Sequence, residues 1–366
     1  MKLLNLIAVP LVSAMVVRTQ EQVPIVDDSK ERIGIHPLRE AREESAPIVG
    51  IHFTTSYAIA SARYHNGTMR DLSKIAGDAQ YTDTMSRWAN GENDISRDCK
   101  DIESPQCRRS TAERSQRRQA GLPISHDAEI LSVFMTKVHA VIEKDMGGPI
   151  NVTAPAFPWL SPKLWDDLKS AIAHSGLLST RRHGAIPVYR EANAAYAARG
   201  YGLCEPSTNC ISCTETLHSK KAETVLYLNF DNSSMSVGAM RAGSAFDDRA
   251  TFSYGTDAKL GWWNLPVFEV PRAKFWAQIH EMIMAVVQPM ARPPNKIILF
   301  GEHGADDEFK EVAKAAVWEV LEFDVDMMMG AVPKEDVAYL VARGAAEMGF
   351  RDEELMRQGL ALRRDE

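Results

Sequence analysis

The chain of 366 residues is too long for one small hydrophobic core, so two domains or one domain with two lobes are expected. Its hydrophobic content of 45% and charged content of 25% are ordinary for a globular protein. The formal net charge of -7 argues against nucleic acid as the main partner.

Residues 1–47 are expected to form a signal-like segment followed by a linker. One lysine precedes an apolar run over residues 3–17, and residues 12–14 (VSA) resemble the small-residue cleavage site of a signal peptide. The run is too short to span a membrane, and no transmembrane segment is expected elsewhere. The sequence predicts a secretory or extracellular location, with a cytoplasmic chain that begins in a disordered tail as the alternative.

The five cysteines fall into two groups that bear on the compartment. In an oxidising compartment at least one disulfide should form, whereas in the cytosol the second group could bind zinc together with His218, although its spacing matches no strong zinc signature. The cysteines are Cys99 and Cys107 in the first group and Cys204, Cys210 and Cys213 in the second.

Three N-x-Ser/Thr sequons occur, at Asn66, Asn151 and Asn232. About one such sequon is expected by chance in a chain of this composition. Asn151 also opens an apolar segment that should be buried. The sequons therefore add only weak support for secretion.

The first predicted element is a strand hairpin over residues 48–64, with a turn made of hydroxyl side chains. From 80 to 125 the polar, irregular pattern predicts loops and short helices, and the basic run at 108–118 is interpreted as a solvated loop rather than a binding patch. Ser125 and Asp127 are suited to cap the helix that follows.

The rest of the chain alternates strands and helices. A strand with a proline-broken exit spans 147–159, and a helix follows with Ser161 as N-cap, Pro162 in its first turn and Gly176 as its stop. The later predicted elements are a strand and helix at 184–203, a second strand–turn–strand unit at 224–243, a helix at 272–287, a strand and glycine turn at 295–304, a helix at 306–320 and a terminal helix that begins at 334–349.

This order of elements resembles that of the actin-like ATPase superfamily, most closely the nucleotide-binding domain of the DnaK-type, seventy-kilodalton heat-shock chaperones. Residues 49–60 (VGIHFTTSYAIA) look like the first phosphate loop, 225–240 (VLYLNFDNSSMSVGAM) like the second, and 297–304 (IILFGEHG) like the adenosine strand and turn. The resemblance covers residues 48 to 350.

The resemblance implies an α/β protein with a two-lobed actin-like ATPase fold and a reduced second lobe. The first lobe is expected over 48–187 and the second over 188–333. The terminal helix, within 334–366, should pack on the first lobe. The chain stops soon after that helix, so no peptide-binding domain is expected.

The resemblance also implies ATP and magnesium as cofactors and assigns residues to them. Glu191 would help to position the attacking water, and Asp231 could serve as the metal carboxylate. The residues expected to contact the nucleotide are Thr54, Thr55, Ser56, Asp231, Asn232, Ser233, Ser234, Gly301 and Glu302.

The sequence departs from the family where the chemistry lies. His52 and Asn229 stand where the family presents carboxylates, and imidazole is a poor magnesium ligand. Side chains at 231–233 replace glycines that let the backbone approach phosphates. Only about seventy residues separate the second phosphate loop from the adenosine turn, roughly half the family's spacing, so the adenine clamp should be missing.

These departures predict a pseudo-ATPase that acts as a binding scaffold for a protein partner. The alternative is an ATP-binding protein with slow hydrolysis, and ATP hydrolysis is then the only activity expected. Trp262 and Trp263 follow the second phosphate loop. They are interpreted as core packing or as an exposed partner patch, with Trp262 placed to fill space that the missing clamp leaves.

Overall fold

The computed structural model describes residues 46–91, 105–177, 188–204, 222–247, 251–329 and 337–364. These residues fall within one compact unit, Ser45–Glu366. The apolar run at 3–17, three of the five cysteines and His218 lie outside the described residues. Within the described part, no helix has the length and apolar character needed to cross a membrane.

The first of two mixed sheets contains five strands in the order β3-β2-β1-β4-β5. β1, β2 and β3 are antiparallel neighbours, while β4 runs parallel to β1 and β5 parallel to β4. This confirms the α/β class and the predicted hairpin over 48–64, to which the structure adds β3. The strands are β1 (Ile48–Phe53), β2 (Tyr57–Arg63), β3 (Met69–Ala76), β4 (Val152–Phe157) and β5 (Tyr189–Arg190).

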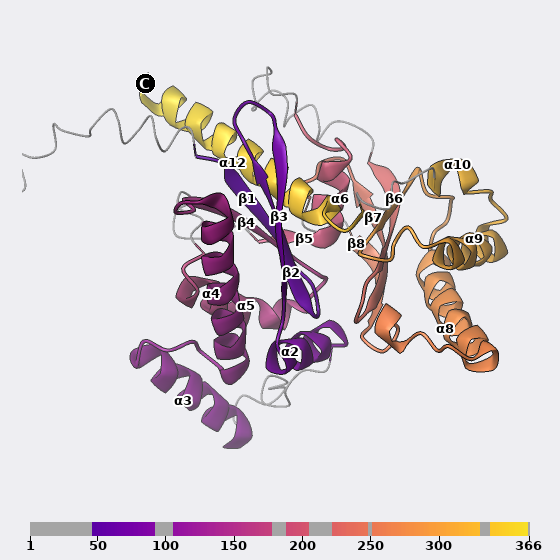
Figure 1. Cartoon of the computed structure of the whole chain (residues 1–366), viewed down its shortest axis with the longest axis horizontal. Helices are drawn as coiled ribbons and strands as arrows, with labels where there is room; N and C mark the ends of the chain where they lie inside the picture. Colours follow the sequence, from indigo (N-terminus) through magenta and orange to yellow (C-terminus); the bar gives the residue numbers. More distant parts are fainter. Residues whose placement is uncertain are drawn as a thin grey trace, which may run out of the picture. The chain divides into compact units, whose positions relative to one another are not determined.

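One face of the first sheet is covered by α2 (Ala79–Ala89), α4 (His126–Met146) and α5 (Trp165–His174), which share a core with it (Figure 1). Ser125 caps α4 by accepting a hydrogen bond from the Ala128 N–H, as predicted. Ser161 makes no such bond, because a single 3-10 turn, η2, precedes α5. The helices are α2 (Ala79–Ala89), α3 (Pro105–Gln119), α4 (His126–Met146), η2 (Pro162–Leu164), α5 (Trp165–His174) and α6 (Glu191–Ala198).

The interpretation of the basic run at 108–118 as a loop is wrong, since these residues lie in α3. Most of their side chains are exposed, so the helix has no continuous apolar stripe that a sequence pattern could reveal. Ion pairs tie it to its neighbours, from Arg114 to the buried Asp167 and from Arg117 to Glu129. These guanidinium groups are partly neutralised within the fold.

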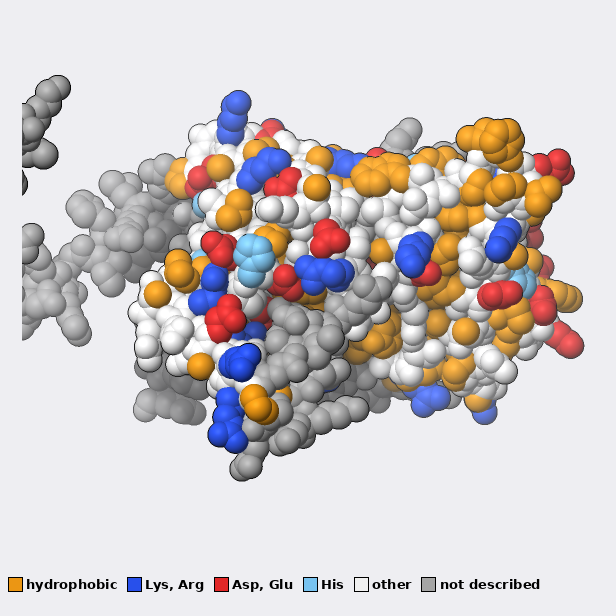
Figure 2. All heavy atoms as spheres, turned by 90° about the horizontal axis from the view of Figure 1, so that it is seen from below, with side chains coloured by type: hydrophobic (Ala, Val, Ile, Leu, Met, Phe, Trp, Pro, Cys, Tyr) orange, Lys and Arg blue, Asp and Glu red, His pale blue; other side chains and the backbone are white. Residues whose placement is uncertain are grey.

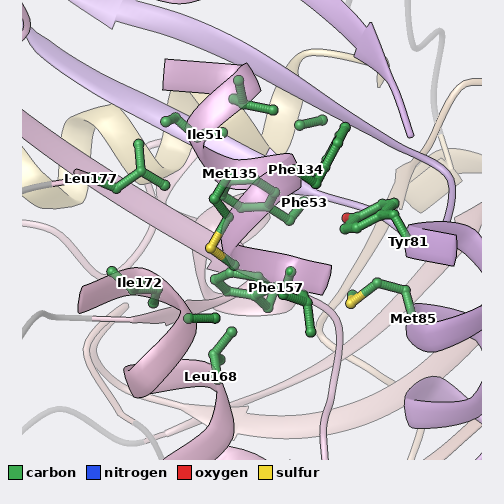
Figure 3. Close-up of a cluster of buried hydrophobic side chains, with 14 of the residues drawn as sticks. Ile51, Phe53, Tyr81, Met85, Phe134, Met135, Phe157, Leu168, Ile172 and Leu177 are labelled. Atoms are coloured by element: carbon green, nitrogen blue, oxygen red, sulfur yellow. The ribbon is translucent and has the colours of Figure 1, made fainter. Parts of the chain in front are cut away.

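Aromatic side chains organise the core under the first sheet. The Phe53 ring, at the end of β1, stacks on the Phe157 ring of β4 with centroids 4.9 Å apart. Phe134 of α4 meets Phe53 edge-on and lies against Tyr81 of α2 (Figure 3). The residue just before the first hairpin turn is therefore fixed by the packed interior.

The second sheet contains four strands in the order β8-β7-β6-β9. Its antiparallel trio and its parallel fourth strand repeat the arrangement β3-β2-β1-β4 of the first sheet. α8, α9 and α10 share a core with it. The elements are β6 (Glu223–Phe230), β7 (Met235–Ala242), β8 (Thr251–Asp257), η3 (Trp262–Asn264), α8 (Glu269–Val287), β9 (Lys296–Phe300), α9 (Asp307–Leu321) and α10 (Asp326–Met329).

The C-terminal helix α12 (Leu340–Arg364) packs against β1, β2, β4 and α6. Side chains of α6 and α12 share one core with residues of both sheets. The approach to β1 is close, since a Cβ added at Gly50 would lie 2.0 Å from the Ala342 carbonyl oxygen. The terminal helix therefore contacts the first sheet.

Candidate functional site

The β1–β2 and β6–β7 hairpin turns occupy equivalent positions in the two sheets. A backbone bond from Thr54 N–H to the Tyr57 carbonyl closes the first turn, at 2.8 Å. The bond from Asp231 N–H to the Ser234 carbonyl closes the second, at 3.0 Å. Each turn begins just after a buried strand, so its side chains are held by a rigid framework.

The two turns touch each other through their side chains. Thr55 Oγ1 lies 2.6 Å from Ser233 Oγ and 2.9 Å from Ser234 Oγ. The Tyr57 hydroxyl donates to Asp231 Oδ1 at 2.6 Å. Three of the hydroxyls expected to bind phosphate are therefore hydrogen-bonded to one another across the two sheets.

The residues of the two hairpin turns that were predicted to bind nucleotide are all buried. Their fractional exposures range from 0% for Asp231 to 8% for Asn232. Hydroxyl oxygens 2.6 Å apart leave no space for a phosphate group between them. The structure thus brings the predicted site residues together, in a contact that excludes solvent.

Thr54 and Ser56 support the first turn in different ways. Thr54 Oγ1 accepts from the Tyr57 N–H at 3.1 Å, and the Thr54 carbonyl accepts from the Tyr81 hydroxyl at 2.6 Å. The Ser56 carbonyl accepts from Gly77 N–H at the end of β3, but its hydroxyl has no hydrogen-bond partner among the described residues.

Glu191, the predicted water-positioning residue, begins α6 and is buried. Its Oε2 lies 3.2 Å from His52 Nε2 and accepts from Asn229 Nδ2 at 3.1 Å. Its Oε1 accepts from Ser236 Oγ at 2.9 Å. Both carboxylate oxygens are therefore engaged by protein donors, and neither points to a free solvent position in this arrangement.

His52 and Asn229 are themselves equivalent, each the next-to-last residue of its strand, β1 or β6. They stand at the two positions where the family resemblance leads one to expect carboxylates. Here they converge on Glu191 from the two sheets. Where the resemblance implies three acidic groups, this chain presents one carboxylate, one imidazole and one amide.

Asp231 is a buried carboxylate with an incomplete set of partners. Oδ1 accepts from the Tyr57 hydroxyl and from Asn232 N–H, whereas Oδ2 has no hydrogen-bond partner among the described residues. Burial raises the pKa of Asp231 above its ordinary value, against the opposing effect of the Tyr57 bond. Burial and the Asp231 charge raise the pKa of Tyr57 well above its usual range, so that hydroxyl keeps its proton.

The residues present do not fit magnesium in this arrangement. Asp231 Oδ2, Asn229 Oδ1 and Ser56 Oγ are unpartnered buried oxygens, but only the first belongs to a carboxylate. Magnesium requires near-octahedral oxygen coordination and usually keeps several waters, which buried turns in contact cannot accommodate. Within the described residues, no group of three or more His, Cys, Asp or Glu side chains is arranged to hold a metal ion.

The predicted adenosine turn packs on the second hairpin. Gly301 has a positive φ of 89°, and a Cβ there would lie 2.2 Å from Asn229 Oδ1. Glu302 forms an ion pair with Lys74 of β3 and accepts from Asn232 Nδ2. The Glu302 pairing links this turn to the first sheet.

Aromatic packing covers the same turn. The Trp262 ring stacks on the His303 ring at 4.2 Å and 7°, while His303 Nε2 lies 2.9 Å from Asn232 Oδ1. Burial lowers the pKa of His303. Trp263 is 64% exposed. The two interpretations of this pair therefore apply separately, with Trp262 in packing and Trp263 at the surface.

Several residues that complete the contact carry no signal in the sequence. These residues are Tyr57, Lys74 and Ser236 on strands and His303 in the turn after β9, and nothing in their local sequence marks them. Only their partners across the chain distinguish them. Tyr57 could have been noticed as a hydroxyl that directly continues the Thr-Thr-Ser turn.

No protein-family model matches the sequence, and a search of curated proteins finds no significant relative.

Proposed function

We propose that the chain is a divergent actin-like protein whose nucleotide site has become a closed hydrogen-bonded contact, and that it acts as a pseudo-ATPase scaffold. The repeated strand arrangement of the two sheets supports this proposal. So does the placement of one hydroxyl-rich turn at the same point in each repeat.

One observation carries the proposal, namely the direct contact of Thr55 with Ser233 and Ser234 between buried turns. A nucleotide could enter only after the turns separate. Separation would break these bonds, the bond between Tyr57 and Asp231 and the ion pair of Glu302. The Tyr57–Asp231 bond contributes about 1.5–3 kcal/mol, and each of the other interactions contributes about 1 kcal/mol or less. The loss of roughly 4–5 kcal/mol would weaken binding by about three orders of magnitude.

An exposed apolar segment supports the scaffold role. The segment from η3 to the first turn of α8 exposes four apolar side chains by 64–90%, namely Trp263, Val267, Phe268 and Val270. Contiguous exposed apolar patches mark sites of interaction with proteins or membranes. On the face drawn in Figure 2, basic and acidic side chains are interspersed, without a continuous basic area.

Calorimetric titration of the full chain with ATP and ADP, each with and without magnesium, tests the proposal. We expect no binding tighter than millimolar. Micromolar, magnesium-dependent ATP binding by the unmodified chain would overturn it. The matched variant replaces His52 and Asn229 with Asp and places Gly at 231–233; it should gain affinity, within the limit set by the absent adenine clamp.

ATP binding with slow hydrolysis is the second candidate, favoured by the unpartnered Asp231 Oδ2, Asn229 Oδ1 and Ser56 Oγ. A cation that entered between separated turns would find these oxygens ready to accept it. If titration detects magnesium-dependent binding, Asp231→Ala should abolish the magnesium dependence under this candidate, and its retention would argue against Asp231 as the ligand.

We further propose that the chain enters the secretory pathway. Cys107 and Cys204 are each disulfide-bonded, and disulfides persist mainly in oxidising compartments. The mature chain should begin near Met15. Intact-mass measurement that finds Met1 retained and five free thiols would overturn this part of the proposal.

A further inference from the structure

The three N-x-Ser/Thr sequons lie in three different environments. Asn232 is buried in the second hairpin turn, where Nδ2 donates to Glu302 and Oδ1 lies beside His303. Asn151 is partly buried directly before the central strand β4, and its sequon threonine, Thr153, is fully within the sheet. Asn66 is exposed in the turn between β2 and β3.

The Asn66 sequon has the geometry of a reactive amide at a hairpin tip. Thr68 donates to Asn66 Oδ1 twice, from its backbone N–H at 2.9 Å and from its hydroxyl at 2.7 Å. Both bonds draw electron density toward the carbonyl oxygen, which makes the Nδ2 protons easier to remove. No described residue accepts a hydrogen bond from that Nδ2.

Space around this sequon is open. A Cβ added at Gly67 would meet no atom within 4 Å, and Gly67 has a φ of 90° that suits the sharp turn. Residues 66 to 68 are all exposed. A bulky group on the amide would therefore meet solvent rather than protein.

We propose that Asn66 is an N-glycosylation site, an inference that rests on the proposed secretory location. The donor is a polyprenyl diphosphate-linked oligosaccharide of the secretory membrane. Asn66 Nδ2 attacks C1 of the first sugar, so that the C1–Nδ2 bond forms and the C1–O bond to the diphosphate breaks. The diphosphate leaves with the electron pair of the broken C1–O bond, the proton lost by Nδ2 passes to a base of the transferase, and no group is oxidised or reduced.

A glycan at Asn66 is compatible with the contact between the turns, whereas one at Asn232 is not. The β2–β3 tip lies at the opposite end of β2 from the first hairpin turn (Figure 1). Seven strand residues separate the two ends by about 20 Å. Glycosylated Asn232 would lose its bond to Glu302 and hold the turns apart.

The test expresses the full chain, with its own N-terminus, in a eukaryotic host that glycosylates secreted proteins. A second version carries a cleavable leader of known efficiency ahead of the same chain. Amidase treatment in heavy-oxygen water followed by peptide mass spectrometry identifies each occupied asparagine. We expect one glycan, at Asn66, that is lost in Asn66→Gln and in Thr68→Ala and kept in Thr68→Ser and Asn151→Gln.

Two results would overturn the proposal, and they separate its parts. In the leader version, an unmodified Asn66 or a glycan on Asn232 of the secreted, folded protein would overturn the choice of acceptor. With the native N-terminus, a chain that keeps Met1 and carries no glycan would overturn the secretory location, and with it the natural modification.

Discussion

The hydroxyl of Tyr57 offers the most direct test of the contact between the two hairpin turns. Tyr57→Phe removes one oxygen and leaves the ring, which is buried on β2. Asp231 then loses one of its two hydrogen-bond donors and keeps only the Asn232 N–H. We therefore predict that this variant weakens the contact between the two hairpin turns without creating a large cavity.

The magnitude follows from the 2.6 Å bond between a hydroxyl and a buried carboxylate. Hydrogen bonds to charged groups contribute about 1.5–3 kcal/mol, and neutral bonds about 1 kcal/mol. We therefore expect Tyr57→Phe to lower the free energy of unfolding by about 2–3 kcal/mol at pH 7. In an Asp231→Asn background the same change should cost about 1 kcal/mol, which gives a coupling energy of about 1–2 kcal/mol.

Urea unfolding followed by tryptophan fluorescence would measure the four proteins of this cycle. The matched control is Tyr81→Phe, because the Tyr81 hydroxyl donates at 2.6 Å to the Thr54 carbonyl within the first sheet. The control should cost about 1 kcal/mol and add to Asp231→Asn within about 0.5 kcal/mol. A coupling below about 0.5 kcal/mol between Tyr57 and Asp231 would refute the contact.

Three further predictions follow from the same geometry. Burial raises the pKa of Asp231, so the stability from this group is full below the unfolded-state pKa and is lost as the pH rises through the folded-state pKa. In parallel urea titrations, Asp231→Asn should therefore gain stability relative to the parent from about pH 4 to pH 7. A loss of stability that widens over this range would contradict the reasoning. Gly50→Ala should push α12 from β1 and lower the free energy of unfolding, measured by chemical denaturation, by about 3 kcal/mol. The control Gly148→Ala, in open space, should change it by less than about 0.5 kcal/mol. Equal effects of the two substitutions would exclude the close approach of α12 to β1. Gly301→Ala, at a φ of 89° and facing Asn229, should lose at least about 2 kcal/mol in thermal unfolding followed by circular dichroism, and an unchanged midpoint would count against the turn as described.

Local chemistry explains which elements the sequence could predict. The β1–β2 hairpin was visible because β-branched and apolar residues flank a hydroxyl turn, and α4 because Ser125 precedes an apolar period. α3 was missed because few of its side chains are buried, so it carries no such period. β3 was missed because five of its eight residues are exposed at or beside the sheet edge, at positions 69–71, 74 and 76, which hides the alternation.

The state of the site could not be predicted in the same way. The sequence identified Thr55, Ser233 and Ser234 as hydroxyl groups on equivalent turns. Whether those hydroxyls surround a ligand or bond to each other depends on how closely the two turns approach. Thr55 lies 178 positions from Ser233 and 179 positions from Ser234 in the sequence. No local pattern encodes the distance between the turns, because it is set by how α6 and α12 pack between the sheets.

The exchange of two expected carboxylates for His52 and Asn229 explains why the turns can close without a ligand. Three acidic groups gathered from two sheets would repel one another and would require a cation to hold them together. Here Glu191 is the acceptor, and contacts with His52, Asn229 and Ser236 engage both of its carboxylate oxygens. Under the proposed actin-like origin, a site that depended on a bound cation would, after these exchanges, join the two sheets by protein hydrogen bonds alone. The substitutions that remove the metal ligands would then provide the permanent contact that the proposed scaffold role requires.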